Sequence, residues 1–289
     1  MVRSLLVIAL FVAIQCLDAS PVNKRPYTAP YGHDVSMPVT HAPPKSLMAR
    51  AEKTACTNIR TDFTQGTSGW KEIDPTRKNW KVTSEGLKLV LAPPEEYVRL
   101  KDSEGLPYNK YAGSGATFNS TDYMQFGKFS ATVKSAPVGG AITAIILIGD
   151  NGDEIDYEML GGDPNHVQTN YFYGDDIVYG VNGDIHKVPK DITENFLTYT
   201  VTWSPSKIEW SINGKTVRVK KQTETCSKGE CKYPTHPMRI QVGLWDGSFQ
   251  PGTAEWAAGP INWDKAPEIA AYIKNIEIEC DPTHNRVSN

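Results

Sequence analysis

The chain has 289 residues, of which 39% are hydrophobic and 22% are charged, and its formal net charge is -3 at pH 7. This is the composition of an ordinary soluble protein. A nucleic-acid-binding protein would normally show a basic excess or a basic stripe, and the sequence has neither. We therefore expect no nucleic acid among its partners.

The first residues predict a secretory signal peptide. Residues 5–14 are apolar and follow Arg3, and this run is shorter than the roughly 20 apolar residues that a membrane-spanning helix needs. We expect residues 1–19 to be removed after Ala19. The protein would then be secreted and extracellular, without a membrane anchor.

The segment at 20–54 is rich in proline and shows no periodic apolar pattern. Such a segment lacks the apolar mass that would offset its ordering entropy, and residues before proline favour extended chain. We predict a disordered leader here, followed by one folded domain at 55–282 and a C-terminal tail at 283–289.

The predicted domain consists of short β-type runs separated by turn signals. Apolar and polar residues alternate in 129–133 and in 199–203, and Asn213-Gly214 is a tight hairpin signal. The apolar run at 141–148 should form a central strand, and only 267–271 is expected to make a helical turn. The pattern predicts an all-β fold, a sandwich or jelly roll of two antiparallel sheets. The expected strands are 86–91, 128–134, 141–148, 153–160, 167–173, 197–203, 207–212, 215–220, 238–244 and 272–279.

Four cysteines remain once the signal peptide is removed, and an even number in an exported chain suggests disulfides. Four cysteines allow three pairings. Cys226 and Cys231 enclose only four residues, whereas Cys56 and Cys280 lie at the two ends of the predicted domain. We therefore predict the bonds 226–231 and 56–280. A zinc site is the alternative, but the spacings match no common zinc pattern.

A sequon for N-glycosylation is present at Asn119-Ser120-Thr121. It is relevant because the chain is predicted to be exported. Asn119 is therefore a candidate glycosylation site.

An acidic stripe is the feature that points most directly to function. Glu154, Asp156 and Glu158 occupy every second position of a predicted strand, so their carboxyl groups share one face. Like charges side by side repel and raise one another's pKa, so the stripe suggests catalysis or a calcium site unless the strand is merely solvated. The apolar run before it and Gly161-Gly162 after it favour a buried strand.

Cleavage of a glycosidic bond uses two carboxyl groups, one to protonate the departing oxygen and one to attack the anomeric carbon or activate water. The stripe could supply both, with Asp156 tuning its neighbours. In an ideal strand the Cα atoms of Glu154 and Glu158 would be ~13 Å apart, whereas a retaining enzyme needs carboxyl groups roughly 5–5.5 Å apart. The sheet must therefore curve, and spacing alone does not choose between retaining and inverting chemistry.

The motif Glu-X-Asp-X-Glu of glycoside hydrolase family 16 is similar to the stripe at 154–158. The run Asp-Glu-Ile-Asp-Tyr-Glu at 153–158, then Gly161 and Gln-Thr-Asn-Tyr-Phe at 168–172, resembles the Crh-like fungal cell-wall transglycosylases (chitin-glucanosyltransferases). The block at 252–263 resembles the late tryptophan block of the family, although it has Ala258 where glycine is usual.

The resemblance implies a concanavalin-like β-jelly roll with a concave substrate cleft and a retaining mechanism. Glu154 would be the nucleophile, Asp156 the assisting acid, and Glu158 the general acid and base. The substrate would be β-linked wall glucan or chitin, with an oligosaccharide acceptor. The alternatives are an endo-β-glucanase on the same fold and a non-catalytic glycan-binding wall protein.

We expect a monomer that is secreted or loosely associated with the cell wall. We expect no cofactor and name no metal ligand, although family analogy leaves room for a structural calcium on the convex face.

Substrate-binding residues are expected among aromatic rings and planar polar groups, because sugars stack on the former and hydrogen-bond to the latter. The candidates are Gln168, Asn170, Tyr171, Trp245 and Trp256. Strand alternation places Gln168 and Asn170 on the face opposite Tyr171, and only one set can face the cleft. The resemblance favours Gln168 and Asn170.

Overall fold

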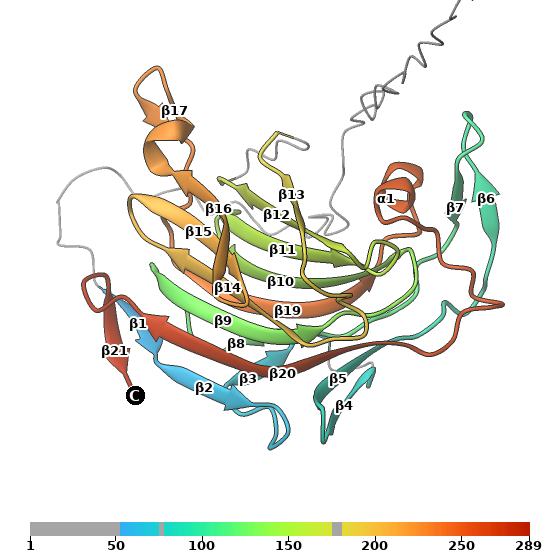
Figure 1. The fold of residues 1–289 in the computed structure, drawn as a ribbon, viewed down its shortest axis with the longest axis horizontal. Helices are drawn as coiled ribbons and strands as arrows, with labels where there is room; N and C mark the ends of the chain where they lie inside the picture. The colour runs from blue at the N-terminus through green and yellow to red at the C-terminus, as the bar shows by residue number, and fades with distance from the viewer. Residues whose placement is uncertain (1–52, 75–77, 175–180) are drawn as a thin grey trace, which may run out of the picture.

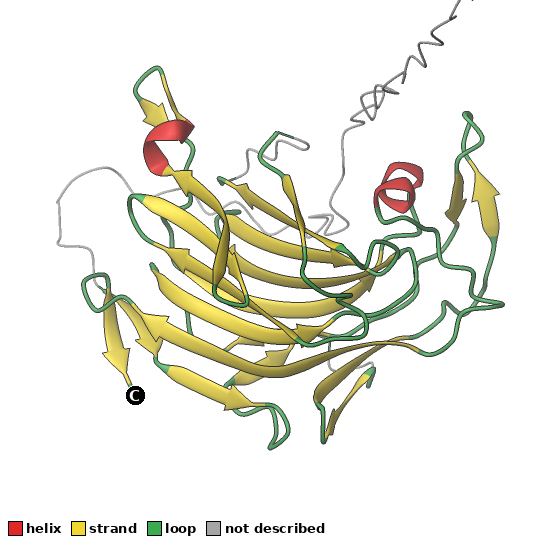
Figure 2. Cartoon of the chain, viewed as in Figure 1, coloured by secondary structure: helices red, strands yellow, loops and turns green. Residues whose placement is uncertain are grey.

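The computed structural model describes residues 53–74, 78–174 and 181–289. The predicted signal peptide and almost all of the predicted leader lie outside these residues. Within them, most of the chain forms two large sheets of seven and eight strands that pack face to face (Figure 1 and Figure 2). None of the helices in the described residues has the length and apolarity needed to cross a membrane.

The seven-stranded sheet carries the acidic stripe, and its neighbouring strands are antiparallel. In spatial order it consists of β13 (Asp184–Lys187), β12 (His166–Phe172), β11 (Glu154–Leu160), β10 (Ala141–Gly149), β19 (Met238–Asp246), β8 (Thr117–Ser120) and β3 (Trp70–Glu72). Strand β10 lies at the centre with nearly all of its side chains buried. The apolar run at 141–148 therefore predicted a central strand correctly.

The eight-stranded sheet covers the other side of the core. It consists of β16 (Lys215–Lys221), β15 (Lys207–Ile212), β14 (Leu197–Trp203), β9 (Gly127–Lys134), β20 (Ile269–Cys280), β5 (Gly86–Leu91) and β4 (Trp80–Thr83), with β2 (Ile59–Asp62) paired to β20. Alternation in β9 and β14 is the signature of this sheet: Phe129, Val133, Tyr199 and Trp203 all point into the core. The antiparallel two-sheet jelly roll is confirmed.

Several short strands and helices lie outside the two large sheets. Strand β1 (Thr54–Thr57) pairs in parallel with β21 (Asn285–Ser288), so residues assigned to the C-terminal tail form a strand beside the start of the domain. The remaining elements are the hairpins β6 (Arg99–Lys101) with β7 (Pro107–Asn109) and β17 (Cys226–Ser227) with β18 (Glu230–Cys231), the 3-10 helix η1 (Gln222–Thr225) and the helix α1 (Pro251–Trp256).

The helical turn predicted at 267–271 is wrong. Residues from Ile269 onward belong to β20, where Ala271 pairs with Leu89 and is fully buried. Pairing with the core of the sheet outweighs the weak local preference of this stretch. The described α-helix lies instead at α1, where Pro251 occupies the first turn and needs no hydrogen bond from its nitrogen.

The acidic strand is anchored by side chains that pack into the core between the two sheets. Ile155, Tyr157 and Met159, which alternate with the acids along β11, have no exposed surface. Burial of a large apolar side chain contributes about 1.5–3 kcal/mol. These three residues therefore fix which face of β11 carries the carboxyl groups, since a one-residue slip would move them into solvent.

Both predicted disulfides are confirmed. Cys56 of β1 is bonded to Cys280 of β20 across a sequence separation of 224, and Cys226 is bonded to Cys231 across a separation of 5. The first bond joins the start of the domain to the end of its longest strand. The second closes the β17–β18 hairpin.

Removal of the long-range disulfide should destabilise the protein far more than removal of the local one. In the chain-entropy description, a bond closing the long loop removes about 5 kcal/mol of unfolded-state freedom, against about 2 kcal/mol for the short loop. The free energy of unfolding, measured with urea, should therefore fall by about 3 kcal/mol more in Cys56→Ala/Cys280→Ala than in Cys226→Ala/Cys231→Ala. Equal losses would contradict this account.

Candidate active site

The acidic stripe faces away from the core, on the outer face of the seven-stranded sheet. In the register of β11 and β12, Asp156 lies opposite Asn170 and Glu158 lies opposite Gln168. Paired positions of neighbouring strands point to the same side of a sheet. The structure thus brings Gln168 and Asn170 to the acids, as the resemblance favoured.

Asp156 is the most buried of the three acids, with 3% of its surface exposed. Its pKa lies well above the ordinary 3.8, chiefly because of burial and then because of the charge of Glu154 and a hydrogen bond with it. The charge of Glu158 acts in the same direction, and Arg218 opposes it. Asp156 therefore keeps its proton to higher pH than an exposed aspartate and shares it with Glu154.

The main chain of the acidic strand is held by side chains that cross the core. The Tyr157 hydroxyl donates to the carbonyl oxygens of Ser211 at 2.9 Å and Thr200 at 3.2 Å. From the other sheet, Trp210 Nε1 donates to the carbonyl oxygen of Asp156 at 3.2 Å. These hydrogen bonds fix the position of the acidic strand relative to the eight-stranded sheet.

Asp153, the acid directly before the stripe, has a different role. Its carboxylate is fully buried and accepts backbone N–H bonds from Gly174 at 2.9 Å, Thr235 at 2.9 Å and His236 at 3.0 Å. Burial raises the pKa of Asp153, but these amide donors outweigh it and the net pKa is lowered. Asp153 thus ties the turn before β11 to two loops that are distant in sequence.

Two tryptophans form an aromatic face at one end of the stripe. The rings of Trp245 and Trp256 are stacked, with centroids 6.0 Å apart and planes 17° apart. Trp256 Nε1 donates to Gln168 Oε1 at 2.9 Å, and Gln168 is the neighbour of Glu158. Helix α1, which carries Trp256, therefore places its ring beside the last acid of the stripe.

This aromatic face belongs to a second apolar cluster, separate from the main core. Its buried members are Ile142, Ala144, Ile146, Leu160, Trp245 and Ala257. The strand positions across from Glu158 carry short side chains, Ala144 and then Gly243. A Cβ at Gly243 would lie 2.8 Å from Thr117 Oγ1, which is too close. Glycine therefore fits at this position, and the positions across from Glu158 carry no large side chain.

The predicted substrate contact of Tyr171 is corrected. Tyr171 pairs with Ile155 on the core side of the sheet and is 3% exposed. Because side chains alternate along a strand, Tyr171 cannot reach the face that carries Asn170 and Gln168. Its ring packs in the main core.

Asn119 lies on β8, in the row of paired positions that runs across the sheet from Asp156. Gln241 Nε2 donates to Asn119 Oδ1 at 2.8 Å, and the row continues through Ile146 to Asp156 and Asn170. Glycosylation of Asn119 stays a prediction. Gln241 was missed because nothing in a mostly apolar run marks it as facing the acids.

Within the described part of the chain, no three His, Cys, Asp or Glu side chains are grouped so that they could hold a metal ion. The stripe thus does not have the convergent ligand set that a calcium site needs. No ligands for a structural calcium are identified either.

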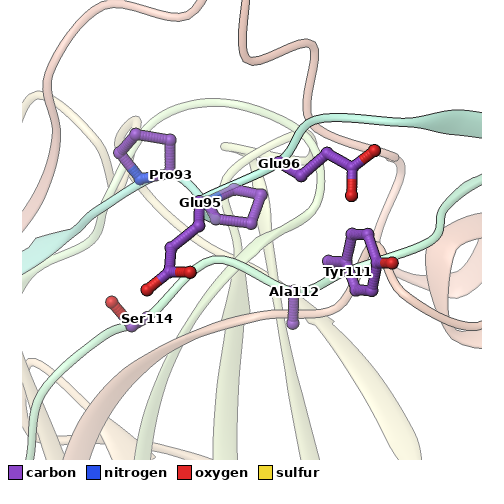
Figure 3. A pocket seen from close by; sticks show the side chains of 7 residues that line it. Pro93, Glu95, Glu96, Tyr111, Ala112 and Ser114 are labelled. Atoms are coloured by element: carbon purple, nitrogen blue, oxygen red, sulfur yellow. The ribbon is translucent and has the colours of Figure 1, made fainter.

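An open pocket of about 590 Å³ lies between the segments that follow β5 and β7 (Figure 3). The two segments are joined by a bridge between Ala92 and Ser114, and Gly113 donates its N–H to Asp246 Oδ2 at 2.7 Å, beside Trp245. None of the three acids is part of its wall. The pocket is lined by Pro93, Pro94, Glu95, Glu96, Tyr111, Ala112 and Ser114.

Asp156→Asn should remove a pH dependence of stability. Because the pKa of Asp156 is raised on folding, the folded protein binds more protons than the unfolded chain above about pH 4, and its stability falls as the pH rises through that window. Asparagine cannot titrate. Urea unfolding at pH 4 to 7 should show the variant gaining on the wild type as pH rises, and a constant difference would contradict this.

Asp153→Asn is the matched control with the opposite sign. The pKa of Asp153 is lowered on folding, so its stabilisation is present above the ordinary pKa and is lost as the pH falls through the folded pKa. The variant should lose roughly 1–3 kcal/mol of unfolding free energy near pH 7 and less in acid. The same urea series measures both variants.

The chain is similar to known proteins over most of the described domain. The model of the glycosyl hydrolases family 16 matches residues 70–265. Crh-like protein 5 of Aspergillus fumigatus is 38% identical over 170 residues, covering 58% of this chain and 42% of that protein. Crh-like protein 2 of the same fungus is 32% identical over 224 residues, covering 74% and 50%. The chain thus spans about half the length of these curated relatives.

Solved structures agree with the sequence comparison. The Crh5 transglycosylase in complex with NAG superposes with a TM-score of 0.66 at 30% identity, covering 79% of this chain and 86% of that chain. The β-glucanase of Bacillus licheniformis shares the fold, with a TM-score of 0.60 at 20% identity and coverage of 78% and 99%. Together with the acidic stripe, these matches show that the chain belongs to glycosyl hydrolases family 16 and is similar to its Crh-like proteins.

Proposed function

We propose that the protein is a retaining enzyme that cleaves β-linked cell-wall polysaccharide, glucan or chitin, and transfers the released glycosyl group to an oligosaccharide acceptor. The observation that carries this proposal is the arrangement of the stripe. A buried acid shares its proton with Glu154, while an aromatic face lies beside Glu158. The two outer acids thus have different surroundings, as two different roles require.

Glu154 is the nucleophile in this proposal. Its carboxylate attacks the anomeric carbon, and the bond to the departing oxygen breaks as Glu158 gives that oxygen a proton. The hydrogen bond from Asp156 stabilises the charge of Glu154 before the attack and again when it leaves. The product of this half-reaction is a glycosyl ester on Glu154.

Glu158 then acts as the base. An acceptor hydroxyl gives its proton to Glu158 and attacks the anomeric carbon, which releases Glu154 as a carboxylate. The sugar that leaves and the sugar that arrives must both lie against Glu158. Trp245, Trp256 and Gln168 occupy that side, where aromatic rings favour the apolar face of a sugar over water.

Two further observations support the nature and place of the substrate. The name of the similar Crh5 structure includes bound NAG, which favours a substrate with N-acetylglucosamine units. Two disulfides in the described domain are typical of an oxidising, extracellular environment. We therefore assign the enzyme to the cell wall or its surroundings.

Azide rescue should separate the roles of the two glutamates. On an aryl β-glycoside of a chitin or glucan oligosaccharide, Glu154→Ala should lose activity by at least about 10³-fold and yield the α-azide, because azide displaces the leaving group once. Glu158→Ala should yield the β-azide through the ester on Glu154. Mass spectrometry and NMR identify the products, and the same anomer from both variants would contradict the assignment.

Trp256→Ala should favour hydrolysis over transfer. Loss of the ring removes about 0.5–1.5 kcal/mol of aromatic contact, so the ratio of labelled transfer product to free sugar should fall roughly threefold to tenfold. Trp256→Phe keeps a ring but loses the bond to Gln168, and should lie between the two. The same assay separates the alternative functions. Shorter products alone from the wild type would identify an endo-glucanase. Unchanged products in Glu154→Gln would show that the protein is not a catalyst.

A further inference from the structure

A half-buried arginine lies behind the acidic strand at one edge of the sandwich. Arg218 belongs to β16, the edge strand of the eight-stranded sheet, and is paired with Trp210. Its guanidinium lies 4.6 Å from the centre of the Trp210 ring. Pairing and stacking together direct the side chain into the space between the sheets.

The guanidinium bridges to the seven-stranded sheet. Nη1 donates to the carbonyl oxygen of Thr169 at 3.0 Å and to its Oγ1 at 2.9 Å, and Nη2 donates to the carbonyl oxygen of Asn182 at 2.6 Å. These acceptors are all neutral. Partial burial of a cation against neutral oxygens is costly unless nearby groups are negative, and the carboxyl groups of Asp184 and Asp156 are the negative groups that favour it.

Two of the three residues that Arg218 contacts, Thr169 and Trp210, touch the acidic strand. Thr169 stands between Gln168 and Asn170 on β12 and pairs with Tyr157 of β11. Trp210, on which the guanidinium stacks, donates its N–H to the carbonyl oxygen of Asp156. Arg218 thus contacts the acidic strand indirectly through two residues, Thr169 and Trp210.

We propose that Arg218 is a positioning residue for the reaction proposed above: it holds β12 beside the acidic strand through Thr169 and supplies, from behind the sheet, a positive charge that partly offsets the repulsion between the acids. The inference rests on the proposed function. It differs from a packing role because a guanidinium acts on the carboxyl groups through its field as well as through its contacts.

The titratable groups around Arg218 are consistent with this role. Asp184 and His186 face it from β13, Tyr171 from β12 and Asp156 from β11. Burial lowers the pKa of His186, whose Nε2 lies 2.8 Å from Thr169 Oγ1, so this ring is neutral near pH 7. Burial also lowers the pKa of Arg218, which nonetheless stays a cation there.

The test is the pH profile of kcat/KM for the full-length protein with a chitin or glucan oligosaccharide. In Arg218→Met the carboxyl groups lose a nearby cation, so both limbs of the profile should move up by about half to one pH unit and kcat/KM at pH 6 should fall at least tenfold. Arg218→Lys keeps the charge but not the fork of donors. Its limbs should stay in place while kcat/KM falls severalfold.

Lys215→Met is the control, because it removes the same charge from the exposed end of β16 and should change neither limb. Unmoved limbs in a folded Arg218→Met protein would overturn the inference and leave Arg218 as a structural brace. If the methionine variant does not fold, Arg218→Lys decides, because limbs that move although the charge is kept would overturn it equally. An inactive wild type would contradict the proposed function itself.

Discussion

The hydrogen bond between the buried carboxyl group of Asp156 and that of Glu154 is the interaction on which the rest of the site depends. Three ionised carboxylates on one strand face would repel one another. A proton held between two of them lowers this repulsion, and burial keeps the proton there. The arrangement demands a rigid strand, which is supplied from the core by Tyr157 and by the Trp210 indole of the opposite sheet.

Glu154 and Glu158 have different surroundings, as the roles proposed for these two glutamates require. Glu154 has the protonated Asp156 as a hydrogen-bond partner, whereas Glu158 lies next to Gln168, and through it next to Trp256. The row formed by Ala144 and Gly243 continues across the sheet from Glu158. The surface is therefore polar beside Glu154, whereas beside Glu158 it carries small and apolar side chains.

Sequence patterns predicted the parts that follow from local alternation. The strand that carries the acids, the central position of β10 and both disulfides could all be read from spacing and apolar runs. Tyr171 was placed wrongly because residue type was weighed above its position in the alternation. Distant contacts could not be predicted. Asp153 and Asp156 are both aspartates, but the pKa of Asp153 is lowered by donors from residues 174, 235 and 236, whereas burial and the neighbouring glutamates raise the pKa of Asp156. The role of Arg218 could not be predicted either, because its contacts with Thr169 and Asn182 join residues that are distant in the sequence.

The pairing of β1 with β21 brings the start and the end of the described domain into one small sheet beside the Cys56–Cys280 bond. In Figure 1 this sheet and the C-terminus lie at the opposite end of the molecule from α1, which carries Trp256. A linker added after Asn289 would leave the molecule far from that helix. If the protein acts on polysaccharide as proposed, attachment to a solid support or a reporter at Asn289 would leave the aromatic face open to long chains.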